Sequence, residues 1–366
     1  MVSAPLGPDL NDNDRPALCV YYYGNQDDLI VDGVYPALTA LSNLGPGFFT
    51  RHWLHGPHVR VYLPGGRKRA QQAVELIRPL LDDYLRRHPS GSAVDEAALL
   101  AQHRILAVQE HITDALTPLH PDNSIRLEQL PQRLAVIGSV DAVALIDDFY
   151  LLTQEVVGSA LGAVCRGTLS RSTLAIELMW AIAHTEPAVT YPFISLRSHA
   201  EGFIAAAPDP DNVRGNFNHQ YDNHMAALRE RRRRLDEQLR AGTEVHHISP
   251  VLHVFSGLRP RIRELVRSRS LNLPTTGPQG EQRWDPGLLR HSTFHARLAD
   301  DPGYRTMLMH DEGFASYRVV VNLLYLHLNR LGIVPFRRAL LAHLAASTVE
   351  DYLGVRAVDL IGRSAS

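Results

Sequence analysis

The chain has 366 residues, enough for one large domain or two smaller ones, and its 45% hydrophobic and 21% charged residues are ordinary for a folded water-soluble protein. Its 37 basic and 39 acidic residues give a net charge of −2, which is too even for general binding to nucleic acids or membrane surfaces. Lys68, the only lysine, stands in a Gly/Arg-rich turn sequence, which argues against Schiff-base catalysis and a phosphate-loop lysine.

Three short strands are predicted near the N-terminus, over residues 17–23, 47–53 and 57–63, because these runs are rich in β-branched and aromatic residues. The last two are joined by Leu54-His55-Gly56, a connection short enough for a hairpin. Side chains alternate along a strand, so the third strand places its valines on one face and His58, Arg60 and Tyr62 on the other. A face of this composition is either solvated or lines a pocket.

After residue 67 the hydrophobic spacing becomes helical. Helices are predicted over 70–84, with Pro79 kinking or splitting the first of them, and then over 97–116, 140–164, 169–184, 217–239, 314–331 and 336–353. Residues 270–287 are predicted to form a loop or linker. Too few buried strands alternate with helices for a parallel sheet, so the predicted fold class is α+β, with an N-terminal sheet and a helix-rich C-terminal part.

We expect a cytoplasmic protein without a membrane segment. Residues 1–15 are polar and lack the apolar core of a signal peptide, and the most apolar stretch, 319–334, is too short and too polar to span a bilayer. The arginine-rich run 229–234 lies on the outer face of the predicted helix over 217–239. Such a run is usually a solvated face, and the alternative is contact with an acidic partner.

No known cofactor or metal motif is present. The histidines cluster at His246, His247 and His253 and again at His291 and His295, but neither group shows a zinc-ligand pattern. A dinucleotide fingerprint, a phosphate loop and a serine-hydrolase elbow are also lacking in the sequence. We therefore expect no metal and no cofactor.

One stripe of the predicted helix over 314–331 is polar. Arg318, Asn322 and Tyr325 follow each other at spacings of four and three residues, with Tyr317 at the edge of the stripe. Burying polar groups in an apolar helix costs about 1–3 kcal/mol each unless they are paired. The stripe is thus either a satisfied polar network between helices or the wall of a pocket, and the pattern alone does not separate these two interpretations.

Two segments resemble a known family. The segment FFTRHWLHGPHVRVYL, residues 48–63, resembles the hairpin F-I-R-Y … G-P-H-L-R-L-R-F of the thiopeptide-type bacteriocin biosynthesis domain, the glutamate-elimination C-terminal part of lantibiotic dehydratases, which also occurs as a stand-alone protein. The C-terminal residues resemble the stand-alone members that make the central pyridine of thiopeptides. The matching positions are FASYR at 314–318, Asn322, Tyr325, Leu331-Gly332, Pro335 and Val349-Glu350.

This resemblance implies a single elimination-domain-like catalytic domain over residues 1–366. It implies a thiopeptide pyridine synthase, a cofactor-independent lyase and cyclase that joins two dehydroalanines of a ribosomally made precursor peptide in a formal aza-[4+2] cycloaddition. Loss of water and elimination of the leader peptide then give a pyridine-centred macrocycle. The implied partners are a dehydrated, azole-containing precursor peptide, recognised through its leader and core, and upstream dehydratase or elimination proteins.

The resemblance also suggests roles for individual residues. Tyr317 is the preferred hydrogen-bond donor to the reacting amide, assisted by Asp311 or Ser292, and His58 or His295 would move protons in the later eliminations. The remaining candidates would bind substrate: Arg51, Arg60, Tyr62, Arg318, Asn322 and Tyr325.

Two departures from the family pattern bear on the choice of reaction. Tyr62 stands where elimination members are expected to have a second hairpin arginine, which weakens a bidentate clamp for a leaving glutamate and favours the cycloaddition. Asp311 stands where the synthase pattern is expected to have a serine. The alternatives are a glutamate-elimination lyase of a split lantibiotic dehydratase and a non-catalytic protein that binds the leader peptide.

Overall fold

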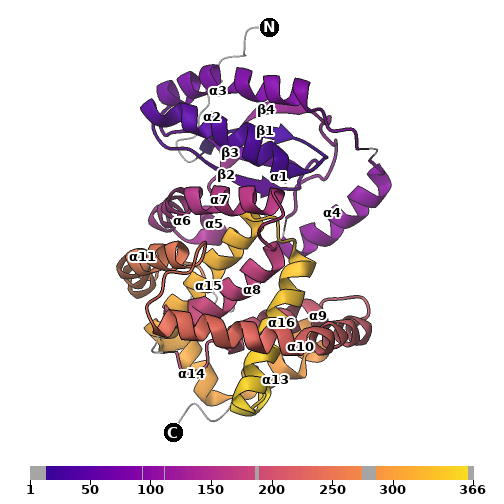
Figure 1. Cartoon of the computed structure of the whole chain (residues 1–366), viewed down its shortest axis with the longest axis vertical. Helices are drawn as coiled ribbons and strands as arrows, with labels where there is room; N and C mark the ends of the chain where they lie inside the picture. Colours follow the sequence, from indigo (N-terminus) through magenta and orange to yellow (C-terminus); the bar gives the residue numbers. More distant parts are fainter. Residues whose placement is uncertain (1–13, 93, 111, 186–188, 274–285, 362–366) are drawn as a thin grey trace. The chain divides into compact units, whose positions relative to one another are not determined.

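The computed structural model describes residues 14–92, 94–110, 112–185, 189–273 and 286–361 (Figure 1). The chain divides into two compact units, each made of two separate segments of the sequence. Unit 1 contains Tyr150–Thr168 and the described part of Met1–Arg133, and unit 2 contains Leu134–Phe149 and the described part of Leu169–Ser366. The predicted α+β class is confirmed, with the strands in unit 1 and a helix-rich C-terminal part. The single domain over 1–366 stays a prediction.

Unit 1 is built on an antiparallel sheet of four strands in the order β2-β3-β1-β4. The predicted hairpin is formed by β2 (Phe48–His52) and β3 (His58–Tyr62), and β1 (Asp14–Tyr21) corresponds to the first predicted strand. The fourth strand, β4 (Ser124–Pro131), was missed because its sequence SIRLEQLP contains glutamate and glutamine and ends in proline.

The two faces of this sheet differ in character. Val59, Val61 and their neighbours Leu18 and Val20 on β1 are fully buried on one face. Helix α3 (Arg67–Arg87) contacts β1 and β4 and buries an apolar stripe that includes Ile77, and it lies along the sheet in Figure 1. The remaining helices of the unit are α1 (Gln26–Asp28), η1 (Leu29–Val34), α2 (Tyr35–Ala40), η2 (Leu41–Asn43), α4 (Glu96–Glu110) and α7 (Gln154–Cys165).

Unit 2 contains helices and loops but no strand among its described residues. Its earlier helices are α5 (Leu134–Ile137), α6 (Val140–Leu152, whose end enters unit 1), α8 (Arg171–Ala181), η3 (Ile182–His184), α9 (Phe193–Ala205), α10 (Pro210–Arg240) and α11 (Ser249–Arg267). Its later helices are α12 (Pro286–His291), α13 (Thr293–Asp300), α14 (Pro302–His310), α15 (Glu312–Arg330), α16 (Pro335–Leu353) and α17 (Ala357–Leu360). No helix among the described residues is sufficiently long and apolar to cross a membrane.

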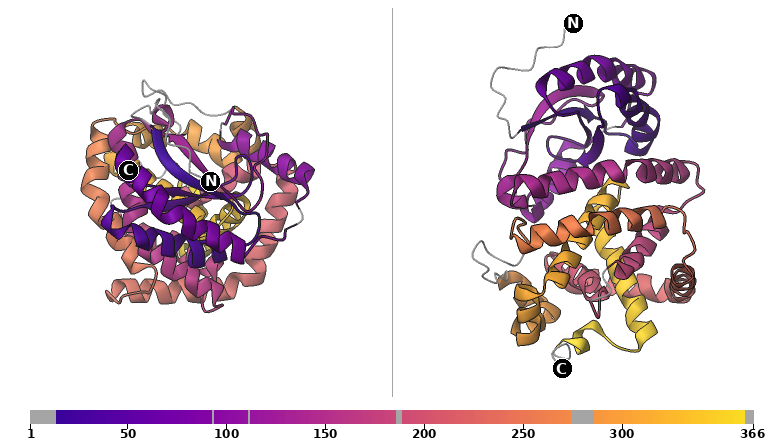
Figure 2. Two further views of the ribbon diagram at one scale, coloured as in Figure 1. Left: turned by 90° about the horizontal axis from the view of Figure 1, so that it is seen from above. Right: turned by 90° about the vertical axis from the view of Figure 1, so that its left-hand side faces the viewer.

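Helix α16 is the central element of unit 2 and appears as the yellow helix in Figures 1 and 2. It packs against α8, α9 and α10. Most of its residues from Ala339 to Val349 are buried, which explains why its sequence is apolar on nearly all sides rather than on one stripe. The buried indole of Trp180 on α8 donates to the backbone carbonyl of Ala345 at 3.1 Å.

A buried arginine joins α9 to α16. The guanidinium of Arg197 donates to both carboxylate oxygens of Glu350, at 3.1 and 2.7 Å, and to the hydroxyl of Ser347 at 2.8 Å. It also contacts Nδ1 of His343 at 2.9 Å. The backbone N–H of Ala357 donates to the same Glu350 side chain at 3.0 Å. Every part of this charge pair is thus hydrogen-bonded, which offsets the cost of removing it from water.

The arginine-rich run on α10 is engaged within the chain. Arg229 pairs with Asp351, Arg231 with Glu177 and Arg232 with Asp236, at 2.7 to 2.8 Å. The other two arginines, Arg233 and Arg234, pair with Glu230 one turn away. These contacts tie α10 to α8 and α16 or stabilise α10 itself, and they leave the run no geometric support as a site for an acidic partner.

Several predicted elements differ from the structure. The helix predicted over 140–164 is two helices, α6 and α7, separated at Thr153. Pro79 does not split α3, which continues for 21 residues. The predicted loop over 270–287 lies largely outside the described residues, which stop at 273 and resume at 286. Helix α9 was not predicted, although Phe193, Leu196, Ala200 and Ile204 follow helical spacing.

Replacing Glu350 by glutamine should lower the free energy of unfolding by about 3 kcal/mol, because the buried Arg197 guanidinium would lose the carboxylate that it bonds at two points. The remaining carboxylate, Glu201, lies 3.9 Å away and is shared with Arg214. Urea unfolding followed by circular dichroism measures this change. The exposed pair of Arg267 and Glu264 supplies the control, since Glu264→Gln should change the free energy by about 1 kcal/mol or less. Equal effects of the two substitutions would contradict the central role of the Arg197 pair.

Candidate functional site

The second face of the sheet in unit 1 is polar and carries most of the hairpin candidates. His58, Arg60 and Tyr62 share this face, as their alternation predicts, and the strand register adds Tyr21 and Cys19 from β1. Arg60 is half-buried, and its Nε–H donates to Nε2 of His58 at 3.1 Å. The two terminal guanidinium nitrogens of Arg60 have no partner among the described residues, so they remain able to bind a substrate acceptor.

Arg51 and Tyr62 do not form a clamp with Arg60. Arg51 lies on the opposite face of the sheet, where its guanidinium pairs with the carboxylate of Asp27 on α1 at 2.5 Å. Tyr62 stacks on Phe48, with ring centroids 4.7 Å apart. The structure therefore brings together His58, Arg60 and Tyr62 but separates them from Arg51.

His58 is fully buried, and both of its ring nitrogens are occupied. Nδ1 lies 2.8 Å from the carbonyl oxygen of Gly56 and must donate to it, and Nε2 accepts from Arg60. Burial, together with the nearby charge of Arg60, lowers the pKa of His58 to about 3. The imidazole is thus neutral near pH 7 and fixed in one tautomer, and its role in proton transfer stays a prediction.

His52 is a neighbouring histidine that the sequence reasoning did not select. It pairs with His58 across the hairpin, and its Nδ1 accepts the backbone N–H of Leu54 at 3.1 Å. The proton therefore stays on Nε2, which has no partner among the described residues. Burial and Arg60 keep the pKa of His52 well below its usual value. The sequence feature that could have identified His52 as a site residue is its position inside the hairpin segment 48–63.

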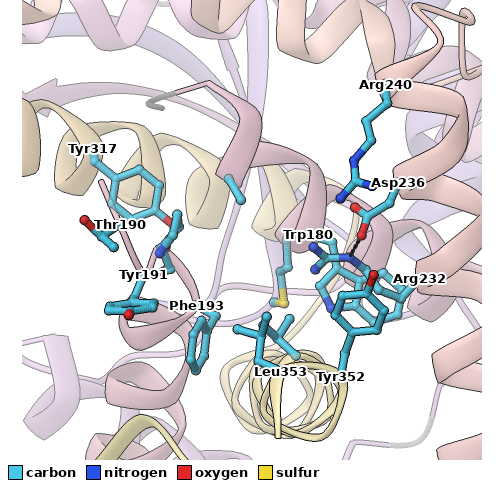
Figure 3. Close-up of a pocket in the computed structure, with 14 residues that line it drawn as sticks. Trp180, Thr190, Tyr191, Phe193, Arg232, Asp236, Arg240, Tyr317, Tyr352 and Leu353 are labelled. Atoms are coloured by element: carbon cyan, nitrogen blue, oxygen red, sulfur yellow. Dashed lines mark hydrogen bonds and ion pairs between the residues drawn. The ribbon is translucent and has the colours of Figure 1, made fainter. Parts of the chain in front are cut away.

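In unit 2, Tyr317 on α15 is almost completely buried. Its hydroxyl donates to the backbone carbonyl of Pro192, the residue before α9, at 3.0 Å, and burial raises the pKa of Tyr317. The Tyr317 ring forms part of the wall of a cavity of about 190 Å³, with Tyr191 and Phe193 beside it (Figure 3). Tyr317 is therefore a neutral donor at the edge of an aromatic cavity.

The rest of the cavity wall is aromatic and charged. Trp180 and Tyr352 contribute rings, and the ion pair of Arg232 with Asp236 lies on the side away from Tyr317 (Figure 3). Arg240 also lines this side and has no ion pair among the described residues. Apart from Arg232, which lies in the arginine-rich run 229–234, these residues were not singled out from the sequence. They come from α8, α10 and α16, which only the fold brings together.

Ser292 and His295 are brought together at the start of α13. Ser292 caps α13, and its hydroxyl lies 2.8 Å from Nδ1 of His295. The other ring nitrogen, Nε2, lies 2.9 Å from the hydroxyl of Ser198 on α9. Burial lowers the pKa of His295 to about 4. Ser292, His295 and Ser198 thus form a continuous hydrogen-bonded chain around a neutral imidazole.

Asp311 takes a different position from the one expected of a catalytic partner. It is exposed and caps α15, where its carboxylate accepts the backbone N–H of Phe314 at 2.8 Å. Six residues separate it from Tyr317, so the two lie about 9 Å apart along the helix axis. The capping contact accounts for an aspartate at this position without any catalytic role.

The polar stripe on α15 is divided between solvent and the interior. Asn322 is exposed, and Arg318 is half-buried, which lowers the pKa of its guanidinium. The Tyr325 ring contacts His199 on α9, with centroids 4.3 Å apart, and its buried hydroxyl has no partner among the described residues. A buried unpaired hydroxyl costs about 1–3 kcal/mol, so the stripe is not a fully satisfied network.

Helix α9 therefore meets candidates from three places in the sequence. The carbonyl of Pro192, directly before α9, accepts a hydrogen bond from Tyr317. Ser198 is hydrogen-bonded to His295, and the His199 ring contacts the Tyr325 ring. No group of three or more histidine, cysteine, aspartate or glutamate residues in the described part of the chain is arranged to hold a metal ion.

The chain matches a family model described as the C-terminal part of lantibiotic biosynthesis dehydratase over residues 17–349. Among solved structures, it is similar to the pyridine synthase TbtD from thiomuracin biosynthesis, with 31% identity and a TM-score of 0.72 over 93% of this chain and 99% of that one. It shares the fold of TsrL, with 18% identity and a TM-score of 0.66 over 96% and 99% of the two chains. No curated protein shows a significant sequence match.

Acid should destabilise the protein through its buried neutral histidines. The pKa values of His58, His327 and His343 are lowered to about 3, and that of His295 to about 4. The unfolded chain, with histidine pKa values near ~6.5, binds more protons below that pH, so stability is constant above it and falls as the pH drops. Each of these histidines should lower the free energy of unfolding by about 1.4 kcal/mol for each pH unit of acidification between about pH 6 and pH 4.

Urea unfolding at pH 7, 6 and 5 measures this slope. In His327→Gln the unfolded chain should take up close to one proton fewer on unfolding, because the buried imidazole is removed. The slope of the unfolding free energy against pH should therefore decrease. The exposed His253 on α11 is the matched control, and His253→Gln should leave the slope unchanged. A wild-type stability that is the same at pH 7 and pH 5 would show that these imidazoles are not held neutral.

Proposed function

Because this chain belongs to the lantibiotic biosynthesis dehydratase C-terminal family, we propose that it is a thiopeptide pyridine synthase. The observation that carries the proposal is the 31% identity to the pyridine synthase TbtD over nearly the full length of both chains. Its substrate would be a ribosomally made precursor peptide, dehydrated and bearing azoles, and upstream dehydratase or elimination proteins would supply it.

The proposed reaction joins two dehydroalanines of one peptide. Four atoms of a 2-aza-diene, formed from one dehydroalanine and the adjoining amide, add to the alkene of the second dehydroalanine and close a six-membered ring. Loss of water and then of the leader peptide, released as an amide, makes the ring aromatic. These steps are additions and eliminations without net oxidation, so the reaction requires no redox cofactor.

Orientation supplies much of the rate in such a reaction. Holding the two alkenes of a flexible peptide in a near-attack geometry contributes about 7–11 kcal/mol to lowering the barrier. The enzyme must also favour the imidic acid form of one amide, which hydrogen bonds to that amide would do. Tyr317 is the proposed donor, because burial raises its pKa and keeps its hydroxyl protonated, and because its side chain lines the cavity. The hydroxyl would exchange its hydrogen bond to the Pro192 carbonyl for one to the substrate amide. Ser292 would assist it, and Asp311 would act only through the start of α15.

Proton movement in the two eliminations is assigned to the chain of Ser292, His295 and Ser198. Ser198 is half-buried, so a proton can pass from substrate or solvent to the neutral imidazole. Substrate binding is assigned to Arg60, whose terminal nitrogens are unengaged, and to the polar face around it. The other proposed binding residues are Arg51, Tyr62, Arg318, Asn322 and Tyr325.

Glutamate elimination is the second candidate, since the family is defined on lantibiotic dehydratases. The stacking of Tyr62 on Phe48 supports the synthase, because no second arginine stands beside Arg60 on β3 to hold a leaving glutamate bidentately. An elimination enzyme would release glutamate from a glutamylated peptide, and Arg60→Ala would abolish that release. A protein that only binds the leader would leave both the glutamylated peptide and the dehydrated peptide chemically unchanged.

Incubating the protein with a dehydrated, azole-bearing precursor peptide should yield two products. These are the free leader as an amide and a macrocycle whose mass equals that of the substrate minus leader amide and water. Mass spectrometry measures both. The glutamylated form of the same peptide is the comparison, and it should keep its glutamate. A product that retains the full mass of the leader would overturn the synthase proposal.

Tyr317→Phe should lower kcat for the cyclisation about 10²-fold or more, because a preorganised donor to the reacting amide is removed. The same change removes one hydrogen bond to Pro192 and should lower the free energy of unfolding by only about 1 kcal/mol. Measuring turnover and urea unfolding on the same preparation separates the two effects. Turnover equal to that of the wild type would exclude Tyr317 from the mechanism.

A further inference from the structure

His199 is a half-buried histidine on α9 that no sequence pattern singled out. It lies next to Ser198, the residue that bonds His295, and against the ring of Tyr325. One neighbour, Ser198, belongs to the hydrogen-bonded chain assigned to proton movement, and the other, Tyr325, to the residues assigned to substrate binding. Its own ring nitrogens are not used by either group.

Arg338 on α16 sets the tautomer of His199. The Nε–H of Arg338 donates to Nε2 of His199 at 3.1 Å. A guanidinium is a donor only and always charged, so Nε2 must accept and the imidazole proton must lie on Nδ1. The guanidinium also lies over the Tyr325 ring, 5.1 Å from its centroid, so one arginine holds both aromatic side chains.

The protonated nitrogen, Nδ1, has no partner among the described residues and is not one of the polar atoms sealed from solvent. Burial and the charge of Arg338 lower the pKa of His199 to about 3, so the ring stays neutral near pH 7. The site thus presents a single N–H donor of fixed direction without a positive charge. Such a donor matches an uncharged acceptor, and the backbone carbonyl is the most frequent uncharged acceptor in a peptide.

We propose that the Nδ1–H of His199 donates a hydrogen bond to a backbone carbonyl oxygen of the peptide substrate, and that Arg338 is the positioning residue that keeps the proton on Nδ1. No proton leaves the imidazole in this role. The donor stabilises negative charge on the carbonyl oxygen of the bound amide. The proposal rests on the proposed function for the identity of the peptide, and the hydrogen bond itself can be tested separately.

The first test compares His199→Ala with His199→Asn in the cyclisation of a dehydrated, azole-bearing peptide. Loss of one preorganised donor should lower kcat/KM about 10²-fold in His199→Ala. His199→Asn places an amide N–H near the former position of Nδ1 and should restore at least about a tenth of the wild-type value. His224→Ala, on the exposed part of α10, is the control and should match the wild type. Equal activity of His199→Ala and the wild type would overturn the proposal.

The second test reads the tautomer directly. In protein with ¹⁵N-labelled histidine, the signals that disappear in His199→Asn identify His199, and Nδ1 should be the protonated nitrogen. Arg338→Met keeps an unbranched apolar side chain but removes the guanidinium donor, so the proton should move at least partly to Nε2 and kcat/KM should fall. Arg337→Met is the matched control on the same helix, because Arg337 is exposed and its hydrogen-bond partner among the described residues is the Ser172 hydroxyl. A tautomer that does not respond to Arg338→Met would overturn the positioning role.

A non-reactive peptide separates this proposal from the proposed function. The probe is the same azole-bearing peptide with alanine in place of each dehydroalanine. Its binding should shift the His199 Nδ1–H signal and weaken about 10-fold in His199→Ala, a range typical of one neutral hydrogen bond. If the wild type does not cyclise the dehydrated peptide but shows this shift, the synthase proposal fails and the His199 site stands. If the wild type cyclises the dehydrated peptide but the non-reactive peptide does not shift the His199 signal, the synthase proposal stands and the His199 site fails.

Discussion

The buried ion pair between Arg197 and Glu350 is the constraint on which the candidate site in unit 2 depends. It joins helix α9 to α16, and Ser347, His343 and the backbone N–H of Ala357 add further hydrogen bonds to the charge pair. A buried charge pair stabilises a fold only when it is satisfied in this way. Because α9 cannot slide along α16, the residues after Arg197 keep their contacts with α13 and α15.

The polar groups of both units share one electrostatic character. His52, His58, His199 and His295 are imidazoles whose pKa values are lowered by burial, and each is bonded through at least one ring nitrogen. Burial raises the pKa values of Tyr317 and Tyr325, and the arginines of the run 229–234 are engaged with carboxylates of the same chain. Fixed, neutral dipoles of this kind stabilise small shifts of charge without rearranging during a reaction. They suit a cyclisation, in which no strong acid or charged nucleophile is required.

The sequence predicts local features well and spatial ones poorly. Strict alternation identified the hairpin and placed His58, Arg60 and Tyr62 on one face, and the family resemblance identified the pyridine synthase branch, in agreement with the similarity to TbtD. Helix α9 was missed because serine, histidine and glycine dilute its apolar stripe, although the helical spacing is present.

The pairing of polar atoms could not be predicted at all, because it depends on contacts between distant helices. The Tyr317 hydroxyl is bonded to a carbonyl 125 positions away, and the tautomer of His199 is set by a residue 139 positions away. Asp311 has a plain local explanation, since a helix begins directly after it. The contacts of Tyr317 and His199 thus follow the packing of helices, whereas that of Asp311 follows the local sequence.

The way the two units divide the chain limits how such proteins can be recombined. Unit 1 includes Tyr150–Thr168, so the chain changes units three times, after residues 133, 149 and 168. A single crossover between two homologous genes at residue 133 would give one unit 1 of mixed parentage, with its sheet from one parent and α7 from the other. Exchange of a whole unit requires three junctions. Any single crossover between residues 35 and 154 would take Tyr35 and the backbone carbonyl that it bonds, that of Gln154, from different parents.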